Sequence, residues 1–129
     1  MAPGLTEYLT DAARKPFQWG SADCATFVLE WFDRLSTATR AHLWAGAYDS
    51  EETCAAWCAE QGGYSAIADA FLGGWYGARR AEPKAGNAVL VNFRGTEMMG
   101  IRVDDHNIAL KSLRVMITKR ATPLIEWSI

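Results

Sequence analysis

Cys24 is the residue of this chain best placed to do chemistry. It begins an apolar pattern with the spacing of one helix face, at Cys24, Phe27, Val28, Trp31, Phe32 and Leu35. In the turn before it, Gly20 permits a sharp bend, and Ser21 or Asp23 can accept hydrogen bonds from the first free amides. The sequence therefore predicts a cysteine in the first turn of a helix, on its inward face. The helix dipole there favours a lowered pKa and a nucleophilic thiolate, whereas a cysteine used only for packing needs no such turn.

The other residues with reactive side chains are two more cysteines and two histidines. Cys54 and Cys58 are four residues apart and can share one side of a helix, but two ligands do not make a zinc site. We expect both thiols to be packing residues. His42 and His106 are distant from them in sequence, so the chain is expected to hold no metal and no cofactor.

Length and composition indicate one globular domain spanning 1–129. Half of the 129 residues are hydrophobic and the net charge is −2. Basic residues form only short pairs, at 79–80 and 119–120, which argues against nucleic-acid binding. No signal peptide and no membrane-spanning stretch is recognised, so we expect a protein made in the cytoplasm without membrane insertion.

The elements that must position Cys24 are helices followed by strands. Helices are expected at about 6–13, 24–35, 49–60 and 64–72, with one helical turn around His42 and Trp44; strands are expected at about 88–93, 98–103, 108–111, 115–117 and 124–127. Asp49 and Glu52 have the spacing of an N-cap and its reciprocal partner. The prediction is an α+β domain, with a helical part at about 1–75 packed on an antiparallel sheet of four to five strands at about 83–129.

This order, with a cysteine opening the buried helix, resembles the papain-like superfamily of cysteine peptidases, and within it the NlpC-type cell-wall peptidases. The family's Asp-Cys pair is matched by Asp23-Cys24. Its Pro-Gly-Asp-hydrophobic segment before the first strand is matched loosely by residues 83–91, with Asn87 in place of Asp. Its His-Val-Gly-Ile strand is matched by residues 98–101, which read Met-Met-Gly-Ile. The Phe-Gln-Trp-Gly segment at 17–20 and Trp127 resemble compact variants from bacteriophage tails and phage-derived particles.

The resemblance implies a site in which Cys24 is the nucleophile or its relic, with Asp23, Trp19 and Met98 in the cleft. A cysteine nucleophile needs a neighbouring base and a polar group that orients the base. At the family's histidine position stands Met98, and the orienting polar residue falls near Leu110. Two of the three catalytic positions are therefore apolar.

Three other residues come into question as a substitute base. His106 lies eight residues beyond the expected position, roughly 25 Å along an extended strand, and is expected in an exposed turn. His42 follows the cysteine helix in a loop that can fold back, which makes it the better substitute. Glu97 is adjacent to the expected position, but a carboxylate of ordinary pKa is a poor base for a thiol.

Three functions remain open on the sequence. The first is a catalytically degenerate, structural or adaptor component of a phage tail tip, bound to other tail-tip proteins and incorporated into a virion tail or tail-like particle. Trp44, Trp75 and Tyr76 are then candidate contact residues, although each also suits an ordinary core. The second is an active cysteine peptidase or amidase that cleaves peptidoglycan stem peptides. The third is a module that binds a peptide or an acyl group in the old cleft.

Overall fold

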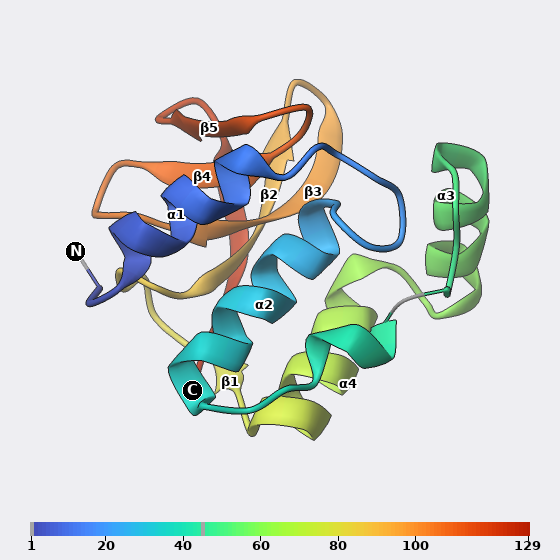
Figure 1. The fold of residues 1–129 in the computed structure, drawn as a ribbon, viewed down its shortest axis with the longest axis horizontal. Helices are drawn as coiled ribbons and strands as arrows, with labels where there is room; N and C mark the ends of the chain where they lie inside the picture. Colours follow the sequence, from blue (N-terminus) through green and yellow to red (C-terminus); the bar gives the residue numbers. More distant parts are fainter. Residues whose placement is uncertain (1, 45) are drawn as a thin grey trace.

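The chain folds into helices that cover one face of a curved sheet (Figure 1). The computed structural model describes residues 2–44 and 46–129. The helices are α1 (Leu5–Arg14), α2 (Cys24–Ser36), the short 3₁₀ helix η1 (Ala41–Trp44), α3 (Glu51–Glu60) and α4 (Tyr64–Tyr76). The strands are β1 (Arg79–Arg80), β2 (Ala88–Phe93), β3 (Thr96–Arg102), β4 (Ile108–Lys111), β5 (Val115–Thr118) and β6 (Thr122–Ser128). The predicted α+β class is confirmed.

The sheet has six antiparallel strands in the order β1-β6-β2-β3-β4-β5. The prediction of four to five strands was wrong because β1 has only two residues. Arg79 and Arg80 pair with Ser128 and Trp127 near the C-terminus. Both arginine side chains are exposed, so no apolar alternation marks this strand in the sequence. A long-range pairing of this kind leaves no local signal.

Two apolar clusters lie on opposite faces of the sheet. The larger lies between the helices and the sheet, and β3 contributes Met99, Ile101 and the following Val103 to it. The smaller lies on the other face and includes Val89, Val91 and Leu110, with Met98 packed against it. Because side chains alternate along a strand, Met98 and Met99 point to opposite sides. α2 lies at the centre of the helical layer, between α1 and α4 (Figure 1).

The boundaries of α3 and α4 differ from those predicted. Ser50, rather than Asp49, is the N-cap of α3, and its hydroxyl and that of Thr53 bond reciprocally to each other's backbone amide. Ser50 has the extended backbone of a cap, which places Thr53, rather than Glu52, at the third helical position. α4 runs through its two glycines to Tyr76 and ends at Gly77, which has a φ of 69°.

Buried ionic groups hold the sheet to its surroundings. Arg102 donates from Nε to Glu126 Oε2 at 2.9 Å, and both side chains are buried between β3 and β6. Asn87 also donates to Glu126, at 3.1 Å. On the helical face, Lys111 Nζ donates to the carbonyls of Ala12, at 2.8 Å, and Lys15. Lys111 thus donates to carbonyls at the end of α1, where the last carbonyls of a helix lack partners within the helix.

Candidate functional site

Asp23 fixes the start of α2 and with it the position of Cys24. Its carboxylate accepts from the amides of Ala25, at 3.1 Å, and Thr26, at 3.0 Å. The Thr26 hydroxyl accepts from the Asp23 amide at 2.8 Å, which completes a capping box. Asp23 is fully buried and also accepts from the Gly20 amide at 2.9 Å. Cys24 is therefore the first residue of the helix, as predicted.

The turn before Cys24 is pressed against the loop that leads into α3. Gly20 has a φ of +84°, and a Cβ added there would lie 2.2 Å from the Tyr48 carbonyl oxygen. The Tyr48 hydroxyl accepts from Trp44 Nε1 at 3.0 Å, and burial and the nearby charge of Asp23 raise the pKa of Tyr48. Only glycine fits this turn, because both the backbone conformation and the close approach exclude a side chain. The turn and Tyr48 thus pack closely against each other next to Cys24.

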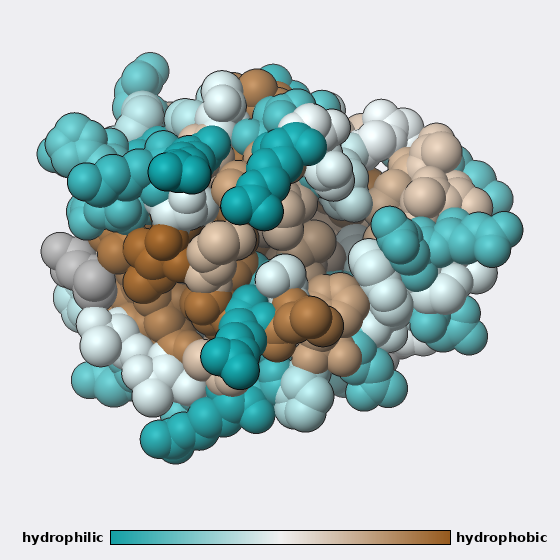
Figure 2. Space-filling model, turned by 90° about the horizontal axis from the view of Figure 1, so that it is seen from above, coloured by the Kyte–Doolittle hydropathy of each residue, from teal (hydrophilic) through white to brown (hydrophobic). Residues whose placement is uncertain are grey.

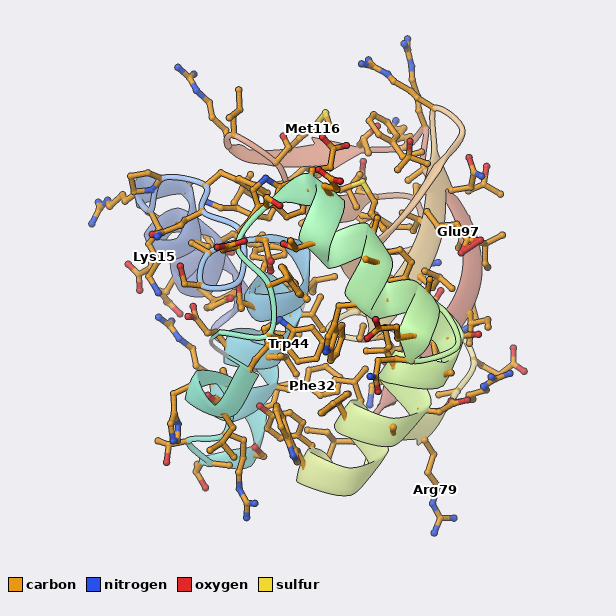
Figure 3. All side chains as sticks on the ribbon, turned by 90° about the vertical axis from the view of Figure 1, so that its right-hand side faces the viewer. Lys15, Phe32, Trp44, Arg79, Glu97 and Met116 are labelled. Carbon is orange, nitrogen blue, oxygen red and sulfur yellow. The ribbon has the colours of Figure 1, made fainter. Side chains whose placement is uncertain are left out.

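The Cys24 side chain faces an apolar pocket between α2, α3, α4 and β3. The unfilled space in it is ≈ 30 Å³, which is room for little more than a water molecule. Its lining residues are Cys24, Ala25, Val28, Leu29, Trp44, Tyr48, Cys54, Cys58, Tyr64, Ile67, Ala68, Phe71, Leu72 and Met99. Among these lining residues none is a histidine, a carboxylate or an amine. Figure 3 looks onto this side of the molecule, with α3 in front and Trp44 and Phe32 pointing inward behind it.

This environment raises the pKa of the Cys24 thiol to about 12. Burial is the largest cause, and the charge of Asp23 adds to it, because both disfavour a thiolate. Backbone hydrogen bonds at Met99 and at Cys24 itself lower the pKa by less. The prediction of a lowered pKa was therefore wrong. The thiol does stand at a helix start, but desolvation outweighs what the helix amides contribute.

Cys54 and Cys58 bring two more thiols to the same pocket. Their sulfur atoms are 3.9 Å apart, so the predicted shared side of the helix is confirmed. Tyr48 and Tyr64 line the pocket together with these two thiols. Burial raises the pKa of Cys54 to about 12 and also raises that of Cys58. All three cysteines are free, and the described part of the chain contains no group of three His, Cys, Asp or Glu side chains that could hold a metal ion.

The structure brings Asp23 and Cys24 together but separates them from two other predicted cleft residues. Met98 packs on the far face of the sheet with the smaller apolar cluster, so its assignment to the cleft was wrong. Met99 takes that place and contacts the pocket. Trp19 is half-buried, stacks edge-on against Phe17 at 4.9 Å between ring centroids, and does not line the pocket.

Neither histidine replaces the missing base. His42 is exposed on η1, while its neighbours Ala41 and Trp44 turn inward. His106 is exposed in the turn after β3, where its amide donates to Asp104 Oδ1 at 2.8 Å, as its predicted place in a turn implies. Leu110, near the expected orienting position, lies in the smaller cluster on the far face. Glu97 is exposed on β3 near the β2–β3 turn (Figure 3).

Sequence reasoning missed the two tyrosines that surround the thiols. Tyr48 stands in a loop with no periodic pattern, so no signal marked it as buried. Tyr64 is the first residue of α4, and Cys58 lies on α3 across the Gly62-Gly63 turn. Only the packing of α3 onto α4 brings them together. The same packing half-buries Trp57, which lies 4.9 Å from Trp44 between ring centroids.

Comparisons with known proteins give one match, to a family. The model of the family described as Domain of unknown function (DUF6950) matches residues 2–129. No curated protein and no solved structure matches the chain. Within the described residues, no helix has the length and apolar character needed to cross a membrane.

Proposed function

The chain belongs to the DUF6950 family, whose function is unknown, and we propose that it is a catalytically inactive NlpC-type, papain-like domain. Its role in this proposal is structural or that of an adaptor among the proteins of a phage tail tip or phage-derived particle. The fold part of the proposal is supported by the helix-then-sheet order and by Asp23-Cys24 at the head of the buried helix. The phage assignment rests on the sequence resemblance.

The observation that carries the inactive reading is the chemical surroundings of Cys24. Cysteine catalysis needs a base within hydrogen-bond reach of the sulfur, or a pKa lowered by nearby positive charge. The lining of the pocket supplies neither, and the pKa of the thiol is raised to about 12. The side chain that β3 presents to the sulfur is that of Met99, which cannot accept a proton at any ordinary pH.

The same pocket favours the structural role over binding of a peptide or an acyl group. With α3 in place, the ≈ 30 Å³ of unfilled space is too small for either ligand. The buried aromatic rings of Trp44 and Tyr48 occupy the part of the pocket beside Cys24. We therefore favour a domain whose relic cleft has become part of its core.

The test compares the wild type with Cys24→Ala on purified peptidoglycan sacculi, with an active NlpC-type peptidase as positive control. We expect no release of stem-peptide fragments by either protein under conditions in which the control enzyme digests the wall. Cys24→Ala should remain folded, with a changed unfolding midpoint because it removes the sulfur of a half-buried side chain that lines the pocket. Fragment release by the wild type that disappears in Cys24→Ala would establish an active peptidase and overturn the proposal.

A second measurement separates the structural role from ligand binding. Fluorescence of the tryptophans beside the pocket, which include Trp44 and Trp57, reports on its interior. Titration with a stem peptide or with a medium-chain fatty acid should leave the emission unchanged. A saturable change that is lost when Ile67→Trp fills the pocket would support the binding function instead.

A further inference from the structure

Charge is strongly segregated along this chain. All 13 Lys and Arg residues lie outside 41–78, the segment that forms η1, α3 and α4. That segment contains Asp49, Glu51, Glu52, Glu60 and Asp69. Asp69 is paired with Arg80 at 2.8 Å, whereas the other four are exposed and in no ion pair within the described part of the chain. The side of the molecule formed by α3 and residue 49 before it therefore carries uncompensated negative charge.

Apolar and aromatic side chains reach the surface on the same side. Leu43 on η1 is 55% exposed. Trp57, Phe71 and Trp75 are half-buried and form a row, with ring centroids 6.1 Å apart for the first pair and 4.9 Å for the second. Tryptophan is among the residues enriched at protein interfaces and at their hot spots. We call this surface, defined by Leu43, Trp57, Trp75, Glu52 and Glu60, the acidic aromatic face.

The opposite character is found at the edge strand β5. Residues 112–120 contain Arg114, Lys119 and Arg120 and no acidic residue. Those three side chains are exposed, and no ion pair engages them among the residues described. Leu113 is 82% exposed and Ile117 is 53% exposed. We call this segment the basic edge; Figure 2 looks onto that side of the molecule and shows apolar side chains bordered by hydrophilic ones.

We propose that the acidic aromatic face binds the basic edge of a second copy of this chain, head to tail. Each surface combines exposed apolar side chains with uncompensated charge, and the two charges have opposite sign. α3 stands at one end of the molecule, whereas β5 is the edge strand of the sheet and runs beside α1 (Figure 1). One copy can therefore use both surfaces at once. An interface between different surfaces of identical chains continues into a ring or a filament.

This arrangement goes beyond the structural role proposed above and does not depend on the state of Cys24. β5 ends the sheet and leaves a row of unpaired backbone groups beside exposed Leu113. An exposed edge strand can pair with another chain, and nearby Lys or Arg side chains limit which surfaces approach it. They repel a second basic edge and admit an acidic surface. The charges thus select head-to-tail contact over edge-to-edge pairing.

The test uses two variants, each of which damages one surface by exposed substitutions. Leu43→Ser with Glu52→Gln alters the acidic aromatic face, and Leu113→Ser with Arg114→Gln alters the basic edge. Sedimentation velocity of the wild type should show a mass that rises with concentration and falls at high salt. Each variant alone should have a dissociation constant for self-association at least about tenfold higher than that of the wild type. An equimolar mixture of the two should form 1:1 dimers and nothing larger, because the pair retains one intact copy of each surface.

The matched control is Leu124→Ser with Glu97→Gln, a change of the same chemistry at exposed residues that belong to neither surface. It should associate as the wild type does. A wild type that stays monomeric at all concentrations overturns the proposal. The acidic aromatic face would then be assigned to a different, basic protein instead of a second copy. The proposal is also overturned if each variant weakens dimerisation and the equimolar mixture is as weak as either variant alone. That pattern belongs to a symmetric interface, in which both copies use the same surface. All variants must keep the wild-type circular dichroism spectrum.

Discussion

Cys24 should alkylate slowly at neutral pH despite its place at a helix start. Burial raises its pKa from 9.0 to about 12, which reduces the thiolate fraction about 1000-fold. A more basic thiolate is also a better nucleophile, and a Brønsted coefficient of about 0.4–0.5 returns about 20- to 30-fold of that loss. The net expectation is a rate about 50-fold below that of an ordinary thiol, before any steric protection by α3 is counted.

The assay is alkylation by iodoacetamide across a pH series from neutral to about pH 10.5. This range passes the ordinary pKa of a cysteine thiol, about 8.5. Digestion and mass spectrometry quantify the Cys24 peptide separately from the peptide that carries Cys54 and Cys58. The same chain unfolded in urea gives the rate of each thiol without its surroundings. In the folded protein the rate at Cys24 should still be rising at the highest pH, with no plateau.

A labelling midpoint for Cys24 below that of the unfolded chain would refute this reasoning. It would mean that a positive charge or a base reaches the sulfur in solution. Cys54 provides an internal control, because burial raises its pKa to about 12 as well. If Cys24 reacted early while Cys54 stayed inert, local opening of α3 could not be the cause, since that opening would expose both.

Further outcomes follow from the packing and from the pKa of Cys24. Gly20→Ala should destabilise the fold by more than about 3 kcal/mol in urea unfolding, since it adds a backbone clash to the cost of a positive φ. Gly77→Ala, which has a similar φ and open space, should cost only about 1 kcal/mol. Glu126→Gln should cost about 3–5 kcal/mol, because it leaves a buried guanidinium without its carboxylate. Lys111→Met should cost about 1–3 kcal/mol by stripping two carbonyls at the end of α1 of their donor. The raised pKa of Cys24 means that the folded state holds this proton more tightly, so stability should fall between pH 9.0 and about 12, by about 1.4 kcal/mol per pH unit for this thiol. Cys24→Ala should flatten that part of the curve, and a slope unchanged by the substitution would contradict the assignment.

The start of α2 could be predicted because its signals are local. A cap residue, a glycine turn and an apolar stripe all lie within residues 20–35 and agree with one another. The Asp23 cap and the first-turn position of Cys24 follow from them directly. In α3 the local signals competed: Asp49 and Ser50 are both good caps, and the backbone conformation chose Ser50.

Local signals could not predict which side chains of β3 point toward the helices. Residues 96–102 carry two adjacent methionines, so the apolar pattern does not tell which of them turns toward the helices. The register with β2, which places Met98 opposite Val91 and Met99 opposite Leu90, decides it. Register depends on distant residues, and β1 escaped notice for the same reason, since its partners lie in the last strand.

The thiol chemistry of Cys24 shows how position and reactivity can come from different parts of a chain. The turn at 20–23 places the sulfur at the amides of a helix start, where a solvated thiol would have a lowered pKa. Residues 48–72 then enclose that sulfur with tyrosines, cysteines and aliphatic side chains, and they raise its pKa instead. A reactive cysteine needs both the helix start and a polar opening. Here α3 adds its two cysteines to the apolar side chains around the sulfur, and the pKa of the half-buried Cys24 rises.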